Sequence, residues 1–230
     1  MKLRLIAVLG MMLLVSPVNA EENLVLKNQK DKVSYIIGMD IGKNFMKQSM
    51  DIDPDILMKG LKDALSGRKP LLTDQEARET MTVFKKEMMA KQEVLAKKLG
   101  EKNKKEGEAF LAENKKTEGV KTLPSGLQYR VIKEGTGRKP KATDKVLTHY
   151  RGTLIDGTEF DSSYKRGTPT SFKVNEIIPG WTEALQLMKE GAKWQLFIPS
   201  NLAYAERGTG HDIGPNATLI FEVELISIQE

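Results

Sequence analysis

The sequence has no cysteine, and this absence excludes several kinds of site. Without a thiol there is no disulfide, no thiolate nucleophile, no thiol-ligated metal and no cysteine for a lipid anchor. Histidine is nearly as scarce: the two histidines, His149 and His211, lie in no regular spacing with carboxylates that is typical of a metal site. We therefore expect a protein that has neither a metal nor a cofactor.

Long apolar runs are also rare. The run from Leu5 to Val15 is shorter than the roughly 20 apolar residues that a membrane-spanning helix needs. Basic residues precede it, and the small residues Val18 and Ala20 follow at cleavage positions. This pattern predicts a secretory signal peptide over residues 1–20 and no membrane span. An exported chain without cysteine is expected in the bacterial periplasm or outside the cell.

The charge of the chain is nearly balanced. There are 36 Lys and Arg against 31 Asp and Glu, a net charge of +5, and two of the basic residues lie in the predicted signal peptide. This balance is weak support for a nucleic-acid binder or an adhesin, and we expect no nucleic-acid partner. The sequence also lacks a nucleophile elbow and a phosphate loop, because the glycine pairs at 135–137 and 208–210 have no following Gly-Lys-Ser/Thr.

Residues 21–72 are predicted to form an all-α region. The segment from Asp31 to Met46 places apolar side chains at helical spacing, and Asp53-Pro54 begins a second amphipathic helix that Gly67 closes. Two short helices cannot cover both of their apolar faces by themselves. Self-association through these helices is the expected way to cover them.

Residues 73–118 contain no proline and are rich in Ala, Lys, Glu, Met and Leu, which predicts one long connecting helix. Thr73-Asp74-Gln75-Glu76 is a capping box at its start. At about 1.5 Å per residue the helix would be roughly 65 Å long. Its apolar positions thin out beyond Leu99, so we expect the second half to be a solvated spacer, with Gly100 and Gly107 as points where it could bend.

Residues 119–230 are predicted to form a second domain. Strand candidates follow at short intervals, over 127–132, 145–154, 158–161, 171–174, 193–199 and 218–228. The segment from Trp181 to Met188 is the one that looks helical, with Trp181, Leu185 and Met188 facing the sheet. The predicted class of the whole chain is α+β: an N-terminal all-α region and a long helix, then an antiparallel sheet wrapped over a short helix.

Aromatic residues make up only 6% of the chain, yet several fall at separated points of the C-terminal half where they could converge. Such a set is either a packed core or an aromatic pocket. The residues concerned are Tyr150, Phe160, Phe172, Trp181, Tyr204 and Phe221.

The residues beside the aromatics, in their order and spacing, resemble those of the FKBP-type peptidyl-prolyl isomerases. The resemblance covers about Leu123 to Ile228. It is carried by His149-Tyr150-Arg151-Gly152, Asp156 to Ser163, Ile177-Ile178-Pro179-Gly180-Trp181, Pro199 to Tyr204 and Pro215 to Phe221.

The resemblance implies a pocket in which Trp181 forms the floor beneath a proline ring. The Tyr204 hydroxyl and the backbone N–H of Ile178 would donate to substrate carbonyls. Asp161 would be a polar group at the rim, paired with Arg166, and Ala203 would also lie at the rim. The walls would be Tyr150, Phe160, Ile177, Ile178 and Phe221.

The layout of helices, long helix and isomerase domain also resembles the Mip-like isomerases, which are secreted bacterial homodimers joined through their N-terminal helices. The resemblance implies an isomerase that acts on proline-containing unfolded or extended polypeptides, with chaperone activity beside it and macrocyclic FKBP inhibitors as candidate ligands. The alternative is a holdase chaperone, or a proline-peptide binding module with little isomerase activity. One departure is Ala205, where the family commonly has glycine after the pocket tyrosine.

Overall fold

The computed structural model describes residues 25–210 and 212–229. The chain divides between Thr73 and Asp74 into two compact units. The predicted signal peptide over residues 1–20 lies outside the described residues. In the described ranges, no helix combines the length and the apolar character that crossing a membrane requires.

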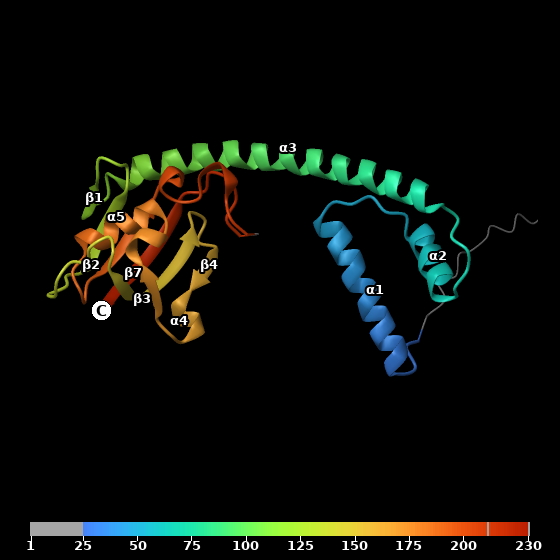
Figure 1. Cartoon of the computed structure of the whole chain (residues 1–230). Coiled ribbons are helices and arrows are strands. Elements are labelled where there is room, and N and C mark those ends of the chain that lie inside the picture. Colours follow the sequence, from blue (N-terminus) through green and yellow to red (C-terminus); the bar gives the residue numbers. More distant parts are fainter. Residues whose placement is uncertain (1–24, 211, 230) are drawn as a thin grey trace, which may run out of the picture. The chain divides into compact units, whose positions relative to one another are not determined.

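The N-terminal unit contains the two predicted helices, α1 (Gln29–Lys47) and α2 (Pro54–Leu65) (Figure 1). The Asn28 side chain caps α1 and the Asp53 side chain caps α2. No residue of α1 is buried, and the buried residue of α2 is Asp63 rather than an apolar one. The apolar faces of both helices are therefore uncovered within this unit.

Helix α3 (Asp74–Asn114) opens the second unit and is 41 residues long. The predicted long helix is present, and most residues of its second half are exposed as expected, but one face of this half packs on the sheet domain, which the prediction of a solvated spacer did not include. Gly100 and Gly107 are both buried rather than exposed bending points. The ring of Phe110 packs 6.0 Å from that of Phe197 in the sheet domain. The sequence pattern did not predict this packing because the packed face consists mostly of small and polar residues, with few large apolar ones.

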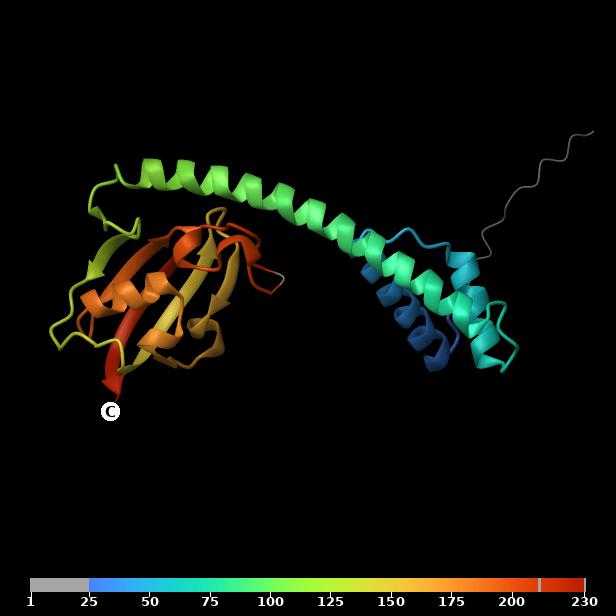
Figure 2. The same cartoon turned by 45° about the horizontal axis from the view of Figure 1, so that its top comes forward.

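One antiparallel sheet of seven strands forms the rest of the unit (Figure 2). The strand order is β1-β2-β6-β7-β3-β4, and β5 pairs with β3. The six predicted strands are present, and β1 was missed because three residues show no readable alternation. The strands are β1 (Val120–Thr122), β2 (Gln128–Lys133), β3 (Lys145–Leu154), β4 (Glu159–Ser162), β5 (Thr170–Lys173), β6 (Lys193–Ile198) and β7 (Leu219–Gln229).

Helix α5 (Pro179–Leu187) covers one face of this sheet (Figure 2). Its buried face carries Trp181 and Leu185, and Met188 just beyond its end is fully buried, as predicted. These side chains pack with apolar residues that alternate along the strands, which forms the core. The core members from the strands include Val146, Leu196, Ile198, Leu219, Val223 and Leu225.

The domain also has one-turn helices that the sequence analysis did not predict. They are too short for a helical period to be readable. They are α4 (Ser163–Arg166) and the 3₁₀ turns η1 (Val174–Glu176), η2 (Ser200–Leu202) and η3 (Ala205–Arg207).

Candidate active site

The aromatic residues of the C-terminal half converge on one cavity of about 600 Å³. It lies where the start of α5 meets β3, β4, β5 and β7, with the segment that follows η2 on another side. The cavity is lined by Tyr150, Phe160, Asp161, Phe172, Glu176, Ile177, Ile178, Trp181, Tyr204, Thr209, Gly210, Asp212, Ile213 and Phe221.

Trp181 lies at the centre of this aromatic set. The rings of Tyr150, Phe172 and Phe221 stand nearly perpendicular or steeply inclined to it, at 85°, 75° and 84°, with centroids 5.3, 5.5 and 5.2 Å away. Edge-to-face contact is a favoured geometry for aromatic pairs. The indole is buried and the other rings surround it, so they form a floor and walls that hold one another in place.

Gly152 allows two of these walls to approach each other. It lies in β3 and pairs in register with Phe221 of β7. An added Cβ at Gly152 would lie 2.6 Å from Phe160 Cζ and 2.7 Å from Phe221 Cε1, closer than real Cβ contacts. The Phe160 and Phe221 rings, 5.4 Å apart, therefore occupy the space that a side chain at residue 152 would take.

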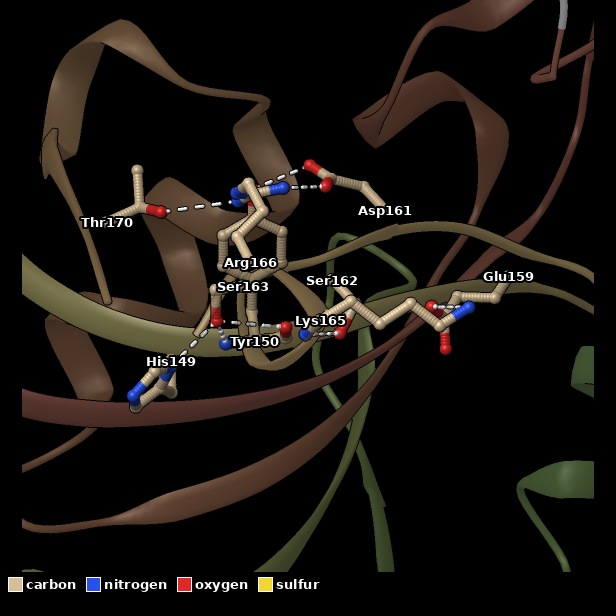
Figure 3. A network of polar contacts seen from close by, with 9 residues as sticks. All are labelled: His149, Tyr150, Glu159, Asp161, Ser162, Ser163, Lys165, Arg166 and Thr170. Carbon is tan, nitrogen blue, oxygen red and sulfur yellow. Dashed lines mark hydrogen bonds and ion pairs between the residues drawn. The ribbon is translucent and has the colours of Figure 1, made fainter. Parts of the chain in front are cut away.

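A polar network holds one edge of the cavity (Figure 3). The Tyr150 hydroxyl donates to Asp161 Oδ2 at 2.6 Å and accepts from Arg166 Nη2 at 2.7 Å. Arg166 also forms an ion pair with Asp161 and donates to Thr170 Oγ1 at 3.3 Å. Behind the ring, the buried Ser163 hydroxyl accepts from the Tyr150 backbone N–H at 2.8 Å. The ring, the carboxylate and the guanidinium are thus fixed relative to one another.

This network sets the protonation states at the rim. Burial raises the pKa of Tyr150, and its hydrogen bond to Asp161 raises it further. Burial alone would raise the pKa of Asp161, but hydrogen bonds from Tyr150 and Arg166 outweigh burial and hold that pKa below its usual value. At neutral pH the rim therefore carries a neutral Tyr150, an anionic Asp161 and a cationic Arg166.

Two hydrogen-bond donors at the cavity are not used by the fold. Within the described part of the chain, neither the Tyr204 hydroxyl nor the backbone N–H of Ile178 has a hydrogen-bond partner. Burial, and secondarily the charge of Asp161, raises the pKa of Tyr204, so its hydroxyl keeps its proton at neutral pH. Both groups are therefore available to a ligand carbonyl.

Comparison with known proteins gives matches over nearly the whole described chain. Residues 136–226 match the family model described as FKBP-type peptidyl-prolyl cis-trans isomerase, and residues 30–131 match the domain amino terminal to it. The chain is 48% identical over 231 residues to "Outer membrane protein MIP" of Legionella longbeachae, covering 100% of this chain and 99% of that protein. The chain belongs to the FKBP-type peptidyl-prolyl isomerase family.

Other relatives agree with this assignment. "Peptidyl-prolyl cis-trans isomerase Mip" of Coxiella burnetii (strain RSA 493 / Nine Mile phase I) is 44% identical, with 89% of each chain covered. The crystal structure of FkpA from Escherichia coli superposes with a TM-score of 0.66 at 38% identity, covering 89% of this chain and 99% of that one. The enzyme class of the chain is peptidyl-prolyl cis-trans isomerase, and its organisation is Mip-like.

In this FKBP-type isomerase, most residues singled out from the sequence lie at the cavity. Two do not line it: Arg166 contacts Asp161 and Tyr150 at the rim without lining the cavity, while Ala203 packs against the core. The sequence analysis gave no role in the pocket to six lining residues, although it named Phe172 among the aromatic residues that could converge. These are Phe172, Glu176, Thr209, Gly210, Asp212 and Ile213.

The missed residues differ in how readable they were. Phe172 is an aromatic residue in a strand candidate, so its type and position were a usable signal. Thr209, Gly210 and Ile213 lie in a hydrophilic segment with no period, and the Thr209–Ile213 bridge that folds it back is a tertiary feature. No group of three or more His, Asp and Glu that could hold a metal occurs among residues 25–210 and 212–229. His149 instead stacks on Tyr164 at 4.7 Å.

Proposed function

We propose that the cavity binds X-Pro segments of unfolded or extended exported polypeptides and speeds rotation about the X-Pro bond. The observation that carries this proposal is the buried Trp181 ring with three aromatic rings around it, at the bottom of a cavity whose Tyr204 and Ile178 donors are unused. A proline ring is compact and apolar and its nitrogen carries no hydrogen in a peptide, so it suits an aromatic floor.

The physical basis of the proposed catalysis is differential stabilisation of a twisted amide. The rotation barrier is about 18–20 kcal/mol and arises from the loss of amide resonance. A planar amide is more polar than a twisted one and loses more on leaving water, so an apolar cavity favours the twisted state. Donors that bind the neighbouring carbonyls hold the bent chain. A millionfold acceleration would require about 8 kcal/mol of such preference and no covalent step.

The roles of individual residues follow from their places in the cavity. Trp181 supports the proline ring, and Tyr150, Phe160, Ile177, Ile178 and Phe221 enclose it. Tyr204 Oη and the Ile178 N–H donate to carbonyls on either side of the rotating bond. Asp161, anchored by Arg166, keeps the Tyr150 ring in position and gives this edge of the cavity a negative charge.

The test is a pair of matched peptides. The full chain should accelerate cis–trans exchange of an X-Pro tetrapeptide, measured by NMR exchange spectroscopy, and binding of this peptide should shift the indole resonance of Trp181. The peptide with alanine in place of proline should leave that resonance unmoved. Equal shifts with both peptides would contradict proline recognition by this cavity.

A second candidate function is that of a holdase chaperone, which the uncovered apolar faces of α1 and α2 favour. The exposed side chains include Val33, Ile36, Ile37, Met39, Ile56, Met58 and Leu61. Suppression of aggregation of an unfolded client should be present in the full chain and lost in a fragment of residues 74–230, the second compact unit. Peptide isomerisation retained by that fragment would assign the two activities to different units.

We also propose that the same faces join two copies of the chain, since the N-terminal region matches the domain that precedes the isomerase in this family. A second copy would cover apolar side chains that are 39–81% exposed on α1 and α2, such as Ile41 and Ile56. Light scattering should give a dimer for the chain from residue 21 and a monomer for residues 74–230. A monomeric full chain would refute the proposal.

Export and inhibitor binding complete the proposal. Residues 1–20 would be removed on export to the periplasm or the exterior, so the mature protein should begin at Glu21, which N-terminal sequencing of the exported protein checks. Macrocyclic FKBP inhibitors should compete with the X-Pro peptide, because both would occupy the space above Trp181.

A further inference from the structure

The C-terminal half of α3 presents a regular stripe of residues to the sheet domain. Gly100, Asn103, Gly107, Phe110 and Asn114 follow one another at intervals of three and four residues, which places them on one face of a helix. Within Glu101–Asn114, this stripe and Leu111 are buried or partly buried, and the other residues are exposed. The stripe contains glycine and asparagine where a packed helix usually has large apolar residues, so it allows the helix to approach closely.

The middle of the stripe packs on the segment that precedes β7. A Cβ added to Gly107 would overlap Thr218 Oγ1 and lie 3.1 Å from Thr218 Cβ. One turn earlier, Asn103 Nδ2 donates to the Pro215 carbonyl at 2.8 Å. Asn216 Nδ2 donates to the Gly100 carbonyl at 3.4 Å. The helix therefore anchors Pro215, Asn216 and Thr218 by backbone contacts and close packing.

The anchored segment in turn holds the turn that carries Tyr204. The backbone N–H of Asn216 donates to the Ala205 carbonyl at 2.8 Å. Ala205 has φ of +50°, in the left-handed region that alanine rarely adopts. Such a conformation persists only where the surroundings hold it. Ala205 directly follows Tyr204, so the placement of the Tyr204 ring depends on this bond.

The helix does not reach this turn directly. A groove lined by Lys104, Glu108, Glu206 and Arg207 separates α3 from η3. The same anchored segment also joins the far wall of the cavity, because Ile213 lines the cavity and an added Cβ at Gly214 would lie 3.0 Å from Leu99 Cδ2. The connection from helix to cavity therefore runs through residues 213–216.

We propose that the C-terminal half of α3 is a positioning element of the isomerase, in which Asn103, through Pro215 and Asn216, fixes the Ala205 turn so that the Tyr204 hydroxyl faces the substrate. The inference rests on the proposed role of the Tyr204 hydroxyl. It makes the catalytic unit begin in α3, near Leu99, and not at residue 119, where the sequence analysis begins the second domain.

The test uses the full chain and one X-Pro tetrapeptide, with kcat and KM measured well below the unfolding temperature. Asn103→Ala removes the donor to Pro215 and should lower kcat/KM by about three- to tenfold, since a displacement of about 1 Å in a site can cost about 100-fold. Lys105→Ala, on the exposed face of the same turn, is the matched control and should be unchanged. Gly107→Ala, which forces α3 away from Thr218, should act in the same direction as Asn103→Ala.

Two double variants separate positioning from a general loss of stability. In a Tyr204→Phe background, Asn103→Ala should have less than about a twofold further effect, because the group it positions is gone. Ala205→Gly should restore most of the activity that Asn103→Ala loses, because glycine keeps the left-handed turn without being held there. A general loss of stability predicts neither result.

The outcomes distinguish this inference from the proposed function. If Tyr204→Phe alone has wild-type kcat/KM, the proposed role of the hydroxyl fails. If Tyr204→Phe is impaired but Asn103→Ala is not, the cavity assignment stands and the positioning role of α3 is overturned. An Asn103→Ala effect that is equally large with and without the Tyr204 hydroxyl also overturns it.

Discussion

Replacing Tyr204 by phenylalanine removes one hydroxyl, and we expect it to lower catalysis without lowering stability. The side chain is 37% exposed, and its hydroxyl has no hydrogen-bond partner among the described residues, so the substitution breaks no bond within the chain. A neutral hydrogen bond contributes about 0.5–1.5 kcal/mol. If the hydroxyl binds a substrate carbonyl only in the twisted state, its loss raises the barrier by that amount. The expected decrease in kcat/KM is about 2- to 12-fold.

Tyr150→Phe is the matched control, since it makes the same chemical change in the same cavity. Its hydroxyl donates to Asp161 at 2.6 Å and accepts from Arg166 at 2.7 Å. Removing it deletes two hydrogen bonds to charged groups, although Asp161 and Arg166 stay paired with each other, and the free energy of unfolding should fall by about 1–3 kcal/mol. Peptide isomerisation and urea unfolding, followed by tryptophan fluorescence, measure the two quantities. Full activity in Tyr204→Phe, or a loss of stability as large as that of Tyr150→Phe, would refute the reasoning.

Three further substitutions test the packing and the charge of the cavity. Phe221→Ala should lower the free energy of unfolding by about 3–5 kcal/mol, because the ring is buried against Trp181; thermal unfolding that stays near wild type would contradict this. Gly152→Ala should lower both stability and kcat/KM, because its Cβ overlaps the two phenylalanine rings; an active, stable variant would show that the rings can move aside. The pKa of Asp161 is below its usual value when folded, so its contribution to stability is complete above the usual value and is lost as the pH falls through the folded value. The urea midpoints of wild type and Asp161→Asn should therefore differ at neutral pH and converge as the pH falls below 3.8, the usual pKa of an aspartate; a constant difference would exclude this linkage.

The regular elements were predictable because their patterns are local. Strand β3 was predicted with the bounds that the structure gives, Lys145–Leu154, and buried residues alternate along it with more exposed ones. The helices α1 and α2 were predicted from amphipathic spacing and from the Asp53-Pro54 start. The one-turn helix α4, which ends in Arg166, was not, because four residues carry no period.

The sequence predicted most of the residues that line the candidate site, but it did not predict the segment that completes its wall. The aromatic and aliphatic members came from motifs of neighbouring residues, whereas Asp212 and Ile213 lie in a segment whose path is set by the Thr209–Ile213 bridge and by contacts with α3. Ala205 could be recognised as a departure from the family. The contact that holds it, from Asn216, joins residues on two different loops and has no local signature.

The sequence by itself determined the order of the elements, the family and most of the residues that line the aromatic cavity, because periodicity and motifs depend on neighbours along the chain. Only the tertiary structure shows that the C-terminal half of α3 packs on the segment that precedes β7. The packed face of α3 from Gly100 to Asn114 consists mostly of glycine and asparagine, so no apolar stripe in the sequence indicates that it is packed. The segment that packs on it lies more than 100 residues further along the chain. Gly107 makes room for Thr218, but the sequence cannot distinguish such a glycine from one at which a helix bends, because the difference depends on the atoms that pack against it.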